Sequence, residues 1–203
     1  MDETYHSSHG AVQEAKHVFI EKGLNALPHV KTIRIFEMGF GTGLNALLTL
    51  EAAQQQNKHI HYIGIEAFPV ALEMALQMEY EHYVSKENQP FFDRLHAAEW
   101  NSDQCITPFF TLKKLEEKIQ YFVPEKSTID LIYFDAFGPS VQSDMWNLNI
   151  LEKMTALLAP GGVFVTYSAK GQMKRDLKSL GLRVESLPGP PGKREMTRAW
   201  KGQ

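Results

Sequence analysis

The sequence has little of several features that would place it in other protein classes. It contains one cysteine, Cys105, which excludes an internal disulfide and is typical of a reducing compartment. No apolar run approaches the roughly 18 residues of a membrane-spanning helix, and the chain does not start with a secretory signal pattern. The spacing of the histidines is not that of a metal site. We therefore expect a cytoplasmic protein with no membrane partner and no metal ion.

Acidic and basic residues are unevenly distributed along a chain of ordinary globular composition. At 203 residues, with 43% hydrophobic and 22% charged residues, the chain is long enough for one buried core and short for two domains. Residues 1–150 carry 11 lysines and arginines against 20 aspartates and glutamates, whereas residues 151–203 carry 10 against 4. A polyanion would therefore meet the last quarter of the chain. The alternative, a basic face that is merely solvated, stays open.

Residues 33–45 are the stretch around which the sequence is organised. A short apolar run reaches Glu37, glycines follow at 39, 41 and 43, and the apolar start of a helix comes next. Glycines let the backbone approach a ligand closely, and a helix N-terminus presents unpaired N–H groups to it. A carboxylate at Glu37 would repel a pyrophosphate and attract a cation, which favours S-adenosylmethionine over a dinucleotide. The predicted cofactor-binding residues here are Glu37, Gly39, Phe40, Gly41, Thr42, Gly43 and Asn45.

Two further acids follow apolar runs that read as buried strands. Glu66 ends the run at residues 61–66, about 20 residues after the glycine turn, where a carboxylate can bind both hydroxyls of a ribose. Glu66 and the adjacent Ala67 are therefore predicted to bind the cofactor. Asp135 ends the run at residues 129–135, and Phe137 lies in the sharp bend that follows. An acid and an aromatic ring at that edge suit an amine held against a methyl donor, with capping of the next helix as the plainer alternative for Asp135.

The order of elements predicts an α/β fold. Apolar strand patterns near residues 33–38, 61–66, 104–112, 129–134 and 162–167 alternate with helical patterns that include residues 69–83 and 112–119. Two strands around a Pro/Gly turn, at residues 183–187 and 194–200, close the chain as a hairpin. We predict one Rossmann-like domain over residues 1–203, a three-layer sandwich with a mostly parallel seven-stranded sheet that ends in an antiparallel hairpin. Residues 1–30 are predicted to form a helical segment over the pocket, and a plain leading helix that covers one face of the sheet is the alternative that periodicity favours.

Four ordered motifs resemble one family of enzymes. They are Asp2-Glu3-Thr4-Tyr5 with Gly10 and Glu14, residues 40–45, Phe134-Asp135-Ala136-Phe137 with Pro139 and Trp146, and residues 193–196. Together they resemble the methyltransferase domain of the bacterial tRNA 5-methylaminomethyl-2-thiouridine biosynthesis proteins, in the stand-alone form without the flavin oxidase domain. The resemblance implies a class I methyltransferase that transfers a methyl group from S-adenosylmethionine to the aminomethyl amine of the wobble uridine. It also implies a separate flavin oxidase or other enzyme that forms the amine.

The resemblance extends to individual residues. Asp135 is the predicted catalytic residue, because it can orient the amine and accept its proton. The predicted substrate-binding residues, which would contact phosphates or the extruded base in the anticodon region, are Tyr5, Phe137, Lys170, Lys193 and Arg194. Members of the family often have a Gly-Asp pair after the third strand for the adenine amino group, and the comparable stretch here is residues 109–112. Thr111 or backbone groups are therefore predicted to contact adenine.

Two other functions are compatible with these residues. An aminopropyltransferase of the spermidine synthase kind also has a glycine turn and an acid after the second strand, but it usually carries acids where this turn has Phe40 and Thr42. A relative that binds tRNA without catalysis would keep the fold and lose the cofactor. Stabilisation by S-adenosylmethionine or by its decarboxylated form separates these possibilities.

Overall fold

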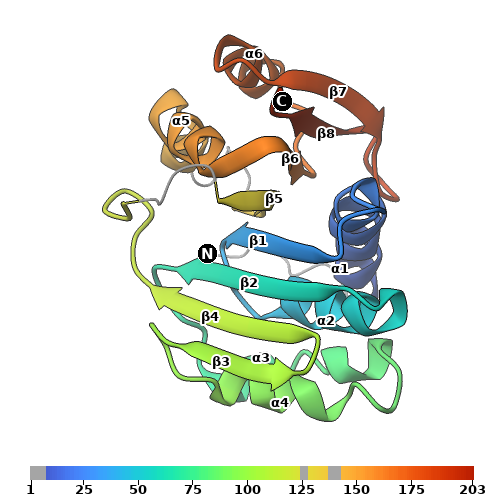
Figure 1. The fold of residues 1–203 in the computed structure, drawn as a ribbon. Helices are drawn as coiled ribbons and strands as arrows, with labels where there is room; N and C mark the ends of the chain where they lie inside the picture. Colours follow the sequence, from blue (N-terminus) through green and yellow to red (C-terminus); the bar gives the residue numbers. More distant parts are fainter. Residues whose placement is uncertain (1–7, 124–127, 137–142) are drawn as a thin grey trace.

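The computed structural model describes residues 8–123, 128–136 and 143–203, which form one mixed sheet with helices on both faces. Figure 1 shows the strands in the order β3-β4-β2-β1-β5-β6-β8-β7, from β3 at the bottom to β7 at the top. The strands are β1 (Thr32–Met38), β2 (His59–Glu66), β3 (Asp103–Thr107), β4 (Phe110–Glu116), β5 (Ile129–Phe134), β6 (Leu158–Thr166), β7 (Arg183–Pro188) and β8 (Glu195–Trp200). The α-helices are α1 (Ser8–Ala15), α2 (Leu44–Gln56), α3 (Leu72–Leu76), α4 (Pro90–Ala97), α5 (Leu148–Leu157) and α6 (Gly171–Ser179). Shorter helical segments are η1 (Lys16–Glu21), η2 (Leu24–Ala26), η3 (Tyr80–Tyr83) and η4 (Ser143–Trp146). The predicted fold class is confirmed.

The central strands β4, β2, β1, β5 and β6 run parallel. Their register aligns Met38 with Ile65 and with Phe134, and it aligns Glu66 with Glu116. The carboxyl ends of these strands therefore lie at one edge of the sheet, which is where open α/β sheets bind ligands. Glu37, Glu66 and Asp135 all belong to this edge.

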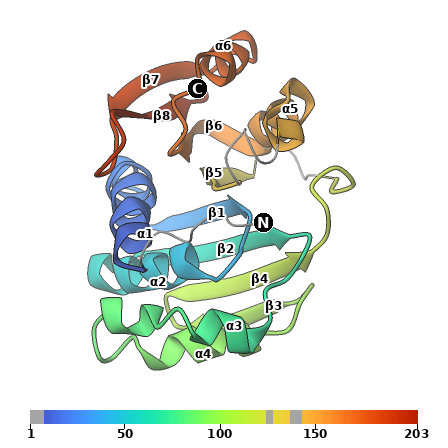
Figure 2. The same cartoon turned by 180° about the vertical axis from the view of Figure 1, so that it is seen from behind.

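Two apolar cores fill the space between the sheet and its helices. One face of the sheet packs against α1, η1, α2 and α4, with Phe19 and Leu47 completely buried at that contact. The other face packs against α5 and α6, with Leu151 and Leu177 buried there. Figure 2, seen from behind, shows α3 and α4 beside β3 and β4. Because α1 and η1 contribute Val12 and Phe19 to the first core, the N-terminal segment is part of the folded domain.

The predicted helix over residues 112–119 is wrong, because β4 continues to Glu116. The sequence hides the two-residue alternation of this strand, since Lys114 occupies an inward position and is only 2% exposed. Its ammonium donates to the carbonyl of His96 at 2.7 Å and lies 4.7 Å from the centre of the Trp100 ring. With these partners, Lys114 occupies a buried strand position where an apolar residue is normally expected, so the alternating pattern of a strand is interrupted in the sequence.

Two other predicted elements differ from the structure. The predicted strand over residues 104–112 is a hairpin of β3 and β4, so the sheet has eight strands where seven were predicted. The long helix predicted from Pro69 is limited to α3, and a separate turn, η3, follows it. Glu79, with φ of +51°, adopts the left-handed conformation between them and ends the helical path.

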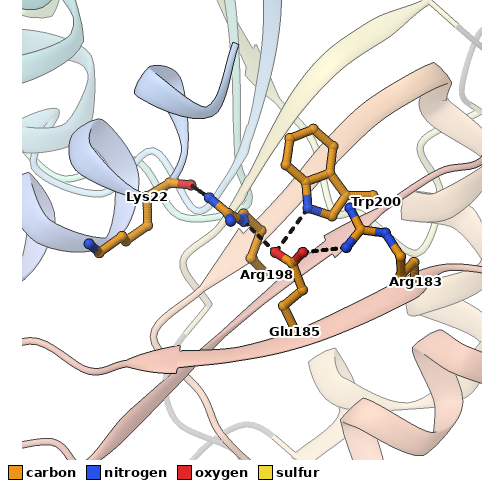
Figure 3. A network of polar contacts seen from close by, with 5 residues as sticks. All are labelled: Lys22, Arg183, Glu185, Arg198 and Trp200. Atoms are coloured by element: carbon orange, nitrogen blue, oxygen red, sulfur yellow. Dashed lines mark hydrogen bonds and ion pairs between the residues drawn. The ribbon is translucent and has the colours of Figure 1, made fainter. Parts of the chain in front are cut away.

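A polar network ties the C-terminal hairpin to the N-terminal helices (Figure 3). Glu185 in β7 accepts hydrogen bonds from Arg198 Nε at 2.8 Å and from Trp200 Nε1 at 3.0 Å, and it also pairs with Arg183. The guanidinium of Arg198 donates in turn to the backbone carbonyl of Lys22 at 3.2 Å. The predicted hairpin is confirmed, and these contacts lock its register across β7 and β8.

Candidate active site

The glycine turn joins β1 to α2 and is fixed to the end of β2. Gly39, Gly41 and Gly43 have φ values of +89°, +50° and +73°, which other residues rarely adopt. The N–H groups of Gly39 and Phe40 both donate to the carbonyl of Ile65 at 3.1 Å. A side chain built at Gly41 would meet nothing within 4 Å, so the turn faces open space at this point. The turn is therefore open to a ligand at Gly41, and its contacts with a cofactor stay predictions.

Phe40 and Thr42 support the turn from below. The Phe40 ring is 4% exposed and packs edge-on against His96 and Trp100. A methyl group on Gly64 would come within 2.5 Å of the Phe40 ring, so this ring requires a glycine in β2. The carbonyl of Thr42 lies 3.1 Å from Nε2 of His96. Gly64 and His96 are supporting residues that the sequence did not reveal, because their signal is a contact with a segment distant in the sequence.

Glu66 lies opposite the glycine turn, as predicted. One carboxylate oxygen accepts from the N–H of Gly41 at 3.1 Å, and the other accepts from the N–H of Phe68 at 2.9 Å. Each carboxylate oxygen can accept more than one hydrogen bond, so Glu66 retains acceptor capacity for hydroxyl groups. Ala67 is half-buried beside it, and Phe68 is 71% exposed.

A buried amide connects two carboxylates under the turn. The Nδ2 atom of Asn45 donates to Glu37 Oε1 at 2.8 Å and to Asp135 Oδ2 at 2.8 Å. Glu37 is 1% exposed and Asn45 is 5% exposed, whereas Asp135 is half-buried. The sequence predicted that Asn45 contacts the cofactor, but its side-chain nitrogen is directed at the two acids.

Burial makes both carboxyl groups weaker acids than usual. Burial, reinforced by the charge of Asp135, raises the pKa of Glu37 well above its ordinary value of 4.5, although the Asn45 amide opposes the shift. Burial also raises the pKa of Asp135 to about 6, and here too the hydrogen bond from Asn45 acts in the opposite direction. Asp135 is therefore ionised at neutral pH but close to its titration range, which suits a group that accepts a proton.

An open depression lies beside Asp135 at the end of β6. It has a volume of about 510 Å³ and is lined by Tyr167, Ser168, Ala169, Lys193, Arg194 and Glu195. The hydroxyl of Tyr167 donates to the carbonyl of Ala136 at 2.8 Å, which connects this wall to the residue after Asp135. The charge of Lys193 acts on Asp135, while Arg194 lines the depression and Lys170 follows Ala169 as an exposed residue at the start of α6.

Lys193 is paired within the fold, while Lys170 and Arg194 are exposed. The Lys193 ammonium lies 2.8 Å from the carboxylate of Glu14 in α1 and 4.0 Å from the centre of the Tyr167 ring. Other basic residues of the last quarter also have internal partners. These are Lys153 on the carbonyls of residues 119, 120 and 122, Lys174 on Glu195, Arg183 and Arg198 on Glu185, and Lys201 on the carbonyls of residues 155 and 158.

Thr111 does not reach the glycine turn. It lies near the start of β4 and is paired with His61, whereas Glu66 is paired with Glu116 at the far end of the same strand. The prediction that Thr111 contacts adenine is therefore wrong, because the strand was placed too early in the sequence. The residues at the correct edge are Glu116, Glu117 and Lys118, and the Lys118 ammonium lies 5.6 Å from the centre of the Phe68 ring.

Tyr5 and Phe137 lie outside the described residues, so their predicted contacts with the substrate stay predictions. Within the described ranges, no cluster of three or more His, Cys, Asp or Glu side chains suited to a metal ion is present. No helix of the described part is long and apolar enough to cross a bilayer.

Comparison with known proteins shows the family to which the chain belongs. The family model described as S-adenosyl-L-methionine-dependent methyltransferase matches residues 101–202, which is half of the chain. The chain belongs to this methyltransferase family. S-adenosylmethionine is therefore the cofactor of the methyltransferase, as the turn with Glu37 and Glu66 predicted.

Curated relatives match almost the whole methyltransferase chain. A protein of Pseudoalteromonas atlantica named tRNA 5-methylaminomethyl-2-thiouridine biosynthesis bifunctional protein MnmC is 32% identical over 216 residues, which cover 96% of this chain and 30% of that protein. A protein of the same name from Chromobacterium violaceum is 30% identical, covering 98% of this chain and 32% of its own length. The methyltransferase spans about a third of the length of these relatives. The resemblance found in the four motifs is confirmed.

Solved structures show the same fold at lower identity. MNMC2 from Aquifex aeolicus matches with a TM-score of 0.73 and 22% identity, over 93% of this chain and 60% of that chain. Spermidine synthase from Thermotoga maritima matches with a TM-score of 0.54 and 13% identity, over 95% of this chain and 60% of that chain. At these identities the matches establish the Rossmann-like architecture alone.

At high pH, the Glu37→Gln variant of the ligand-free methyltransferase should be more stable against unfolding than the wild type. The raised pKa means that the folded protein retains this proton while the unfolded chain loses it near pH 4.5, so wild-type stability falls above that pH. Glutamine does not titrate, and its oxygen can still accept from the Asn45 amide. Thermal unfolding at pH 8 should show a higher midpoint for Glu37→Gln, and the difference should vanish below pH 4.5. An equal difference at all pH values would contradict this explanation.

Proposed function

We propose that this methyltransferase acts on tRNA and converts 5-aminomethyl-2-thiouridine at the wobble position to 5-methylaminomethyl-2-thiouridine. The observation that carries the proposal is the match of 96% of the chain to a protein named for biosynthesis of that nucleoside. The site supports an amine as acceptor, because Asp135 accepts from Asn45 beneath the glycine turn and precedes Ala136, whose carbonyl accepts from Tyr167 in the wall of the depression. Since tRNA in bacteria is cytoplasmic, the proposal includes a cytoplasmic location.

The residues around the turn fit the proposed binding mode of S-adenosylmethionine. Gly41 faces open space, and Glu66 retains acceptor capacity for the two ribose hydroxyls. Gly39, Gly43 and Ala67 would form the walls of this site, with Phe40 and Thr42 supporting them and the buried Glu37 lying beneath. When bound, S-adenosylmethionine supplies a methyl group attached to a positively charged sulfur.

Asp135 has the main chemical task in the proposed mechanism. An alkylammonium keeps its proton near pH 7, and nitrogen attacks only after that proton has left. The Asp135 carboxylate orients the amine and accepts a proton from it, which a pKa of about 6 allows at neutral pH. Holding the nitrogen in line with the methyl group contributes several kcal/mol, on the order of that measured for well-oriented intramolecular reactions.

The proposed partners follow from the same reaction. The aminomethyl group has to be formed first, so a flavin oxidase activity or another amine-forming activity acts before methyl transfer. Residues 1–203 would form a single catalytic domain, in which residues 1–30 cover the pocket. The ion pair of Glu14 with Lys193 supports this arrangement, because it fixes α1 to the tip of the C-terminal hairpin beside the depression.

The test is methylation of defined tRNA in vitro. Purified protein is incubated with methyl-labelled S-adenosylmethionine and tRNA from cells that lack this protein, and the nucleosides are separated after digestion. Labelled 5-methylaminomethyl-2-thiouridine is the expected product. Absence of product, with stronger thermal stabilisation by decarboxylated S-adenosylmethionine, would favour aminopropyl transfer. Stabilisation by neither compound would favour a non-catalytic tRNA-binding protein.

The exposed residues Lys170 and Arg194 should contribute to tRNA affinity through phosphate contacts. The double variant Lys170→Ala/Arg194→Ala should bind tRNA more weakly, and the slope of log affinity against log salt should become shallower by about 2. Filter binding over a series of salt concentrations measures both effects. The matched control Lys86→Ala/Lys178→Ala removes the same charge from exposed positions away from the depression. Equal effects of the two double variants would show that only net charge matters.

A further inference from the structure

The amide of Asn45 uses its whole donor capacity on two carboxylates. An asparagine side chain has two N–H bonds on one nitrogen, and here that nitrogen lies 2.8 Å from Glu37 Oε1 and 2.8 Å from Asp135 Oδ2. Both hydrogens are therefore directed at acids. Such an arrangement is specific in geometry, since the amide plane fixes the directions of both bonds.

The fold brings these three side chains together from three separate elements. Glu37 lies in β1, Asp135 follows β5, and Asn45 is the second residue of α2. Strands β1 and β5 are neighbours, with Glu37 paired with Tyr133 and Met38 paired with Phe134. The left-handed Gly43 starts α2 above this pair of strands, so its first turn reaches both acids.

The side chain of Asn45 is buried beneath the glycine turn and is not exposed at the edge where a cofactor would bind. It is 5% exposed, and its amide oxygen is buried without a hydrogen-bond partner among the described residues. An amide in such surroundings stays in place because rotation would bring its oxygen against a carboxylate. The half-buried Asp135 is the one member of the trio that borders the open edge.

We propose that Asn45 is a positioning residue, whose amide, braced against Glu37, holds the Asp135 carboxylate in one orientation toward the methyl acceptor. This inference rests on the proposed role of Asp135 in methylating an amine. Without Asn45, Asp135 would rotate and face a second buried acid with no donor between them. Removing Asn45 should also raise the pKa of Asp135 further above 6, because the hydrogen bond from the Asn45 amide lowers this pKa in the wild type.

The decisive variant is Asn45→Ala, with Gln55→Ala as a control that removes an exposed amide from the same helix. In Asn45→Ala, kcat for tRNA methylation should fall by about ten- to a hundredfold, the range expected for a misplaced catalytic group. The dissociation constant for S-adenosylmethionine should stay within about twofold, as for independent sites. The acidic limb of the kcat profile should move to higher pH, which a merely structural loss of active protein would not cause.

A double-variant comparison shows whether Asn45 acts through Asp135. Adding Asn45→Ala to Asp135→Asn should cause no further loss of kcat, since the group that Asn45 positions is already gone. An undiminished further loss would overturn the proposal, as would normal kcat and an unshifted pH profile in the single variant. If Asn45→Ala does not fold, Asn45→Ser retains one donor and should give an intermediate shift of the pH profile.

A readout without substrate separates this inference from the proposed function. The carboxyl carbon of Asp135, assigned with Asp135→Asn in protein carrying 13C-aspartate, should titrate near pH 6 in the wild type and at higher pH in Asn45→Ala. Full tRNA methylation by Asp135→Asn would contradict the proposed role of Asp135. An inactive Asp135→Asn with an unchanged Asp135 titration and normal kcat in Asn45→Ala would contradict only the role of Asn45.

Discussion

Replacing Asp135 with asparagine should lower kcat for tRNA methylation by about a hundredfold to ten-thousandfold, the usual contribution of a positioned acid or base. Asparagine has nearly the same shape, and its oxygen can still accept the hydrogen bond from Asn45. It carries no charge and accepts no proton from the amine at neutral pH. The measurement is single-turnover transfer of labelled methyl groups to tRNA at saturating concentrations of both substrates.

Binding measurements make this result specific to chemistry. Calorimetry with S-adenosylmethionine and filter binding with tRNA should give wild-type affinities for Asp135→Asn. The exposed Asp103→Asn in β3 removes an equal charge at the far edge of the sheet and should keep full activity. A hundredfold weaker affinity for the cofactor in Asp135→Asn would reassign Asp135 to cofactor binding.

Replacing Glu66 with alanine should weaken binding of S-adenosylmethionine by about a hundredfold or more. A hydrogen bond to a charged group contributes about 1.5–3 kcal/mol, and two hydroxyl groups would lose their acceptor together. The variant also leaves the N–H groups of Gly41 and Phe68 without their carboxylate, which loosens the turn itself. Isothermal titration calorimetry measures the affinity directly.

The exposed Glu73 in α3 provides the matched control for Glu66. Glu73→Ala removes the same charge shortly after β2 and should leave the affinity for S-adenosylmethionine unchanged. If both variants bind equally well, ribose is held elsewhere. If both lose affinity to the same extent, the effect is one of long-range charge and not of hydrogen bonding.

The edge that carries the acids was predictable from the sequence, because its signals are local. Glu37 and Glu66 each end an apolar run, and the positive φ of the three glycines is something that other residues rarely adopt. The orientation of Asn45 was not predictable, since its partners lie 8 and 90 positions away. A motif identifies the residue type at that position but not the direction in which the side chain points.

The parts that could not be predicted depend on charged side chains with internal partners. Lys114 in β4 and the pair of Lys193 with Glu14, 179 positions apart, look in the sequence like ordinary exposed charges. Misreading Lys114 turned a strand into a helix and displaced the predicted adenine contact to Thr111. Composition alone likewise overstates the free positive charge of the last quarter, where several basic side chains bind backbone carbonyls or acids.

The position of β8 also determines when the sheet can be completed. Among the described residues it is the last of the eight strands of the sheet in chain order, yet it lies between β6 and β7. During vectorial synthesis, β6 and β7 leave the ribosome with a gap between them, and each has an unpaired edge open to other chains. The gap closes only when residues 195–200 emerge. The helices α1 and η1, which reach Arg198 through Lys22, gain that anchor in the same event, so they are expected to complete their folding together with β8.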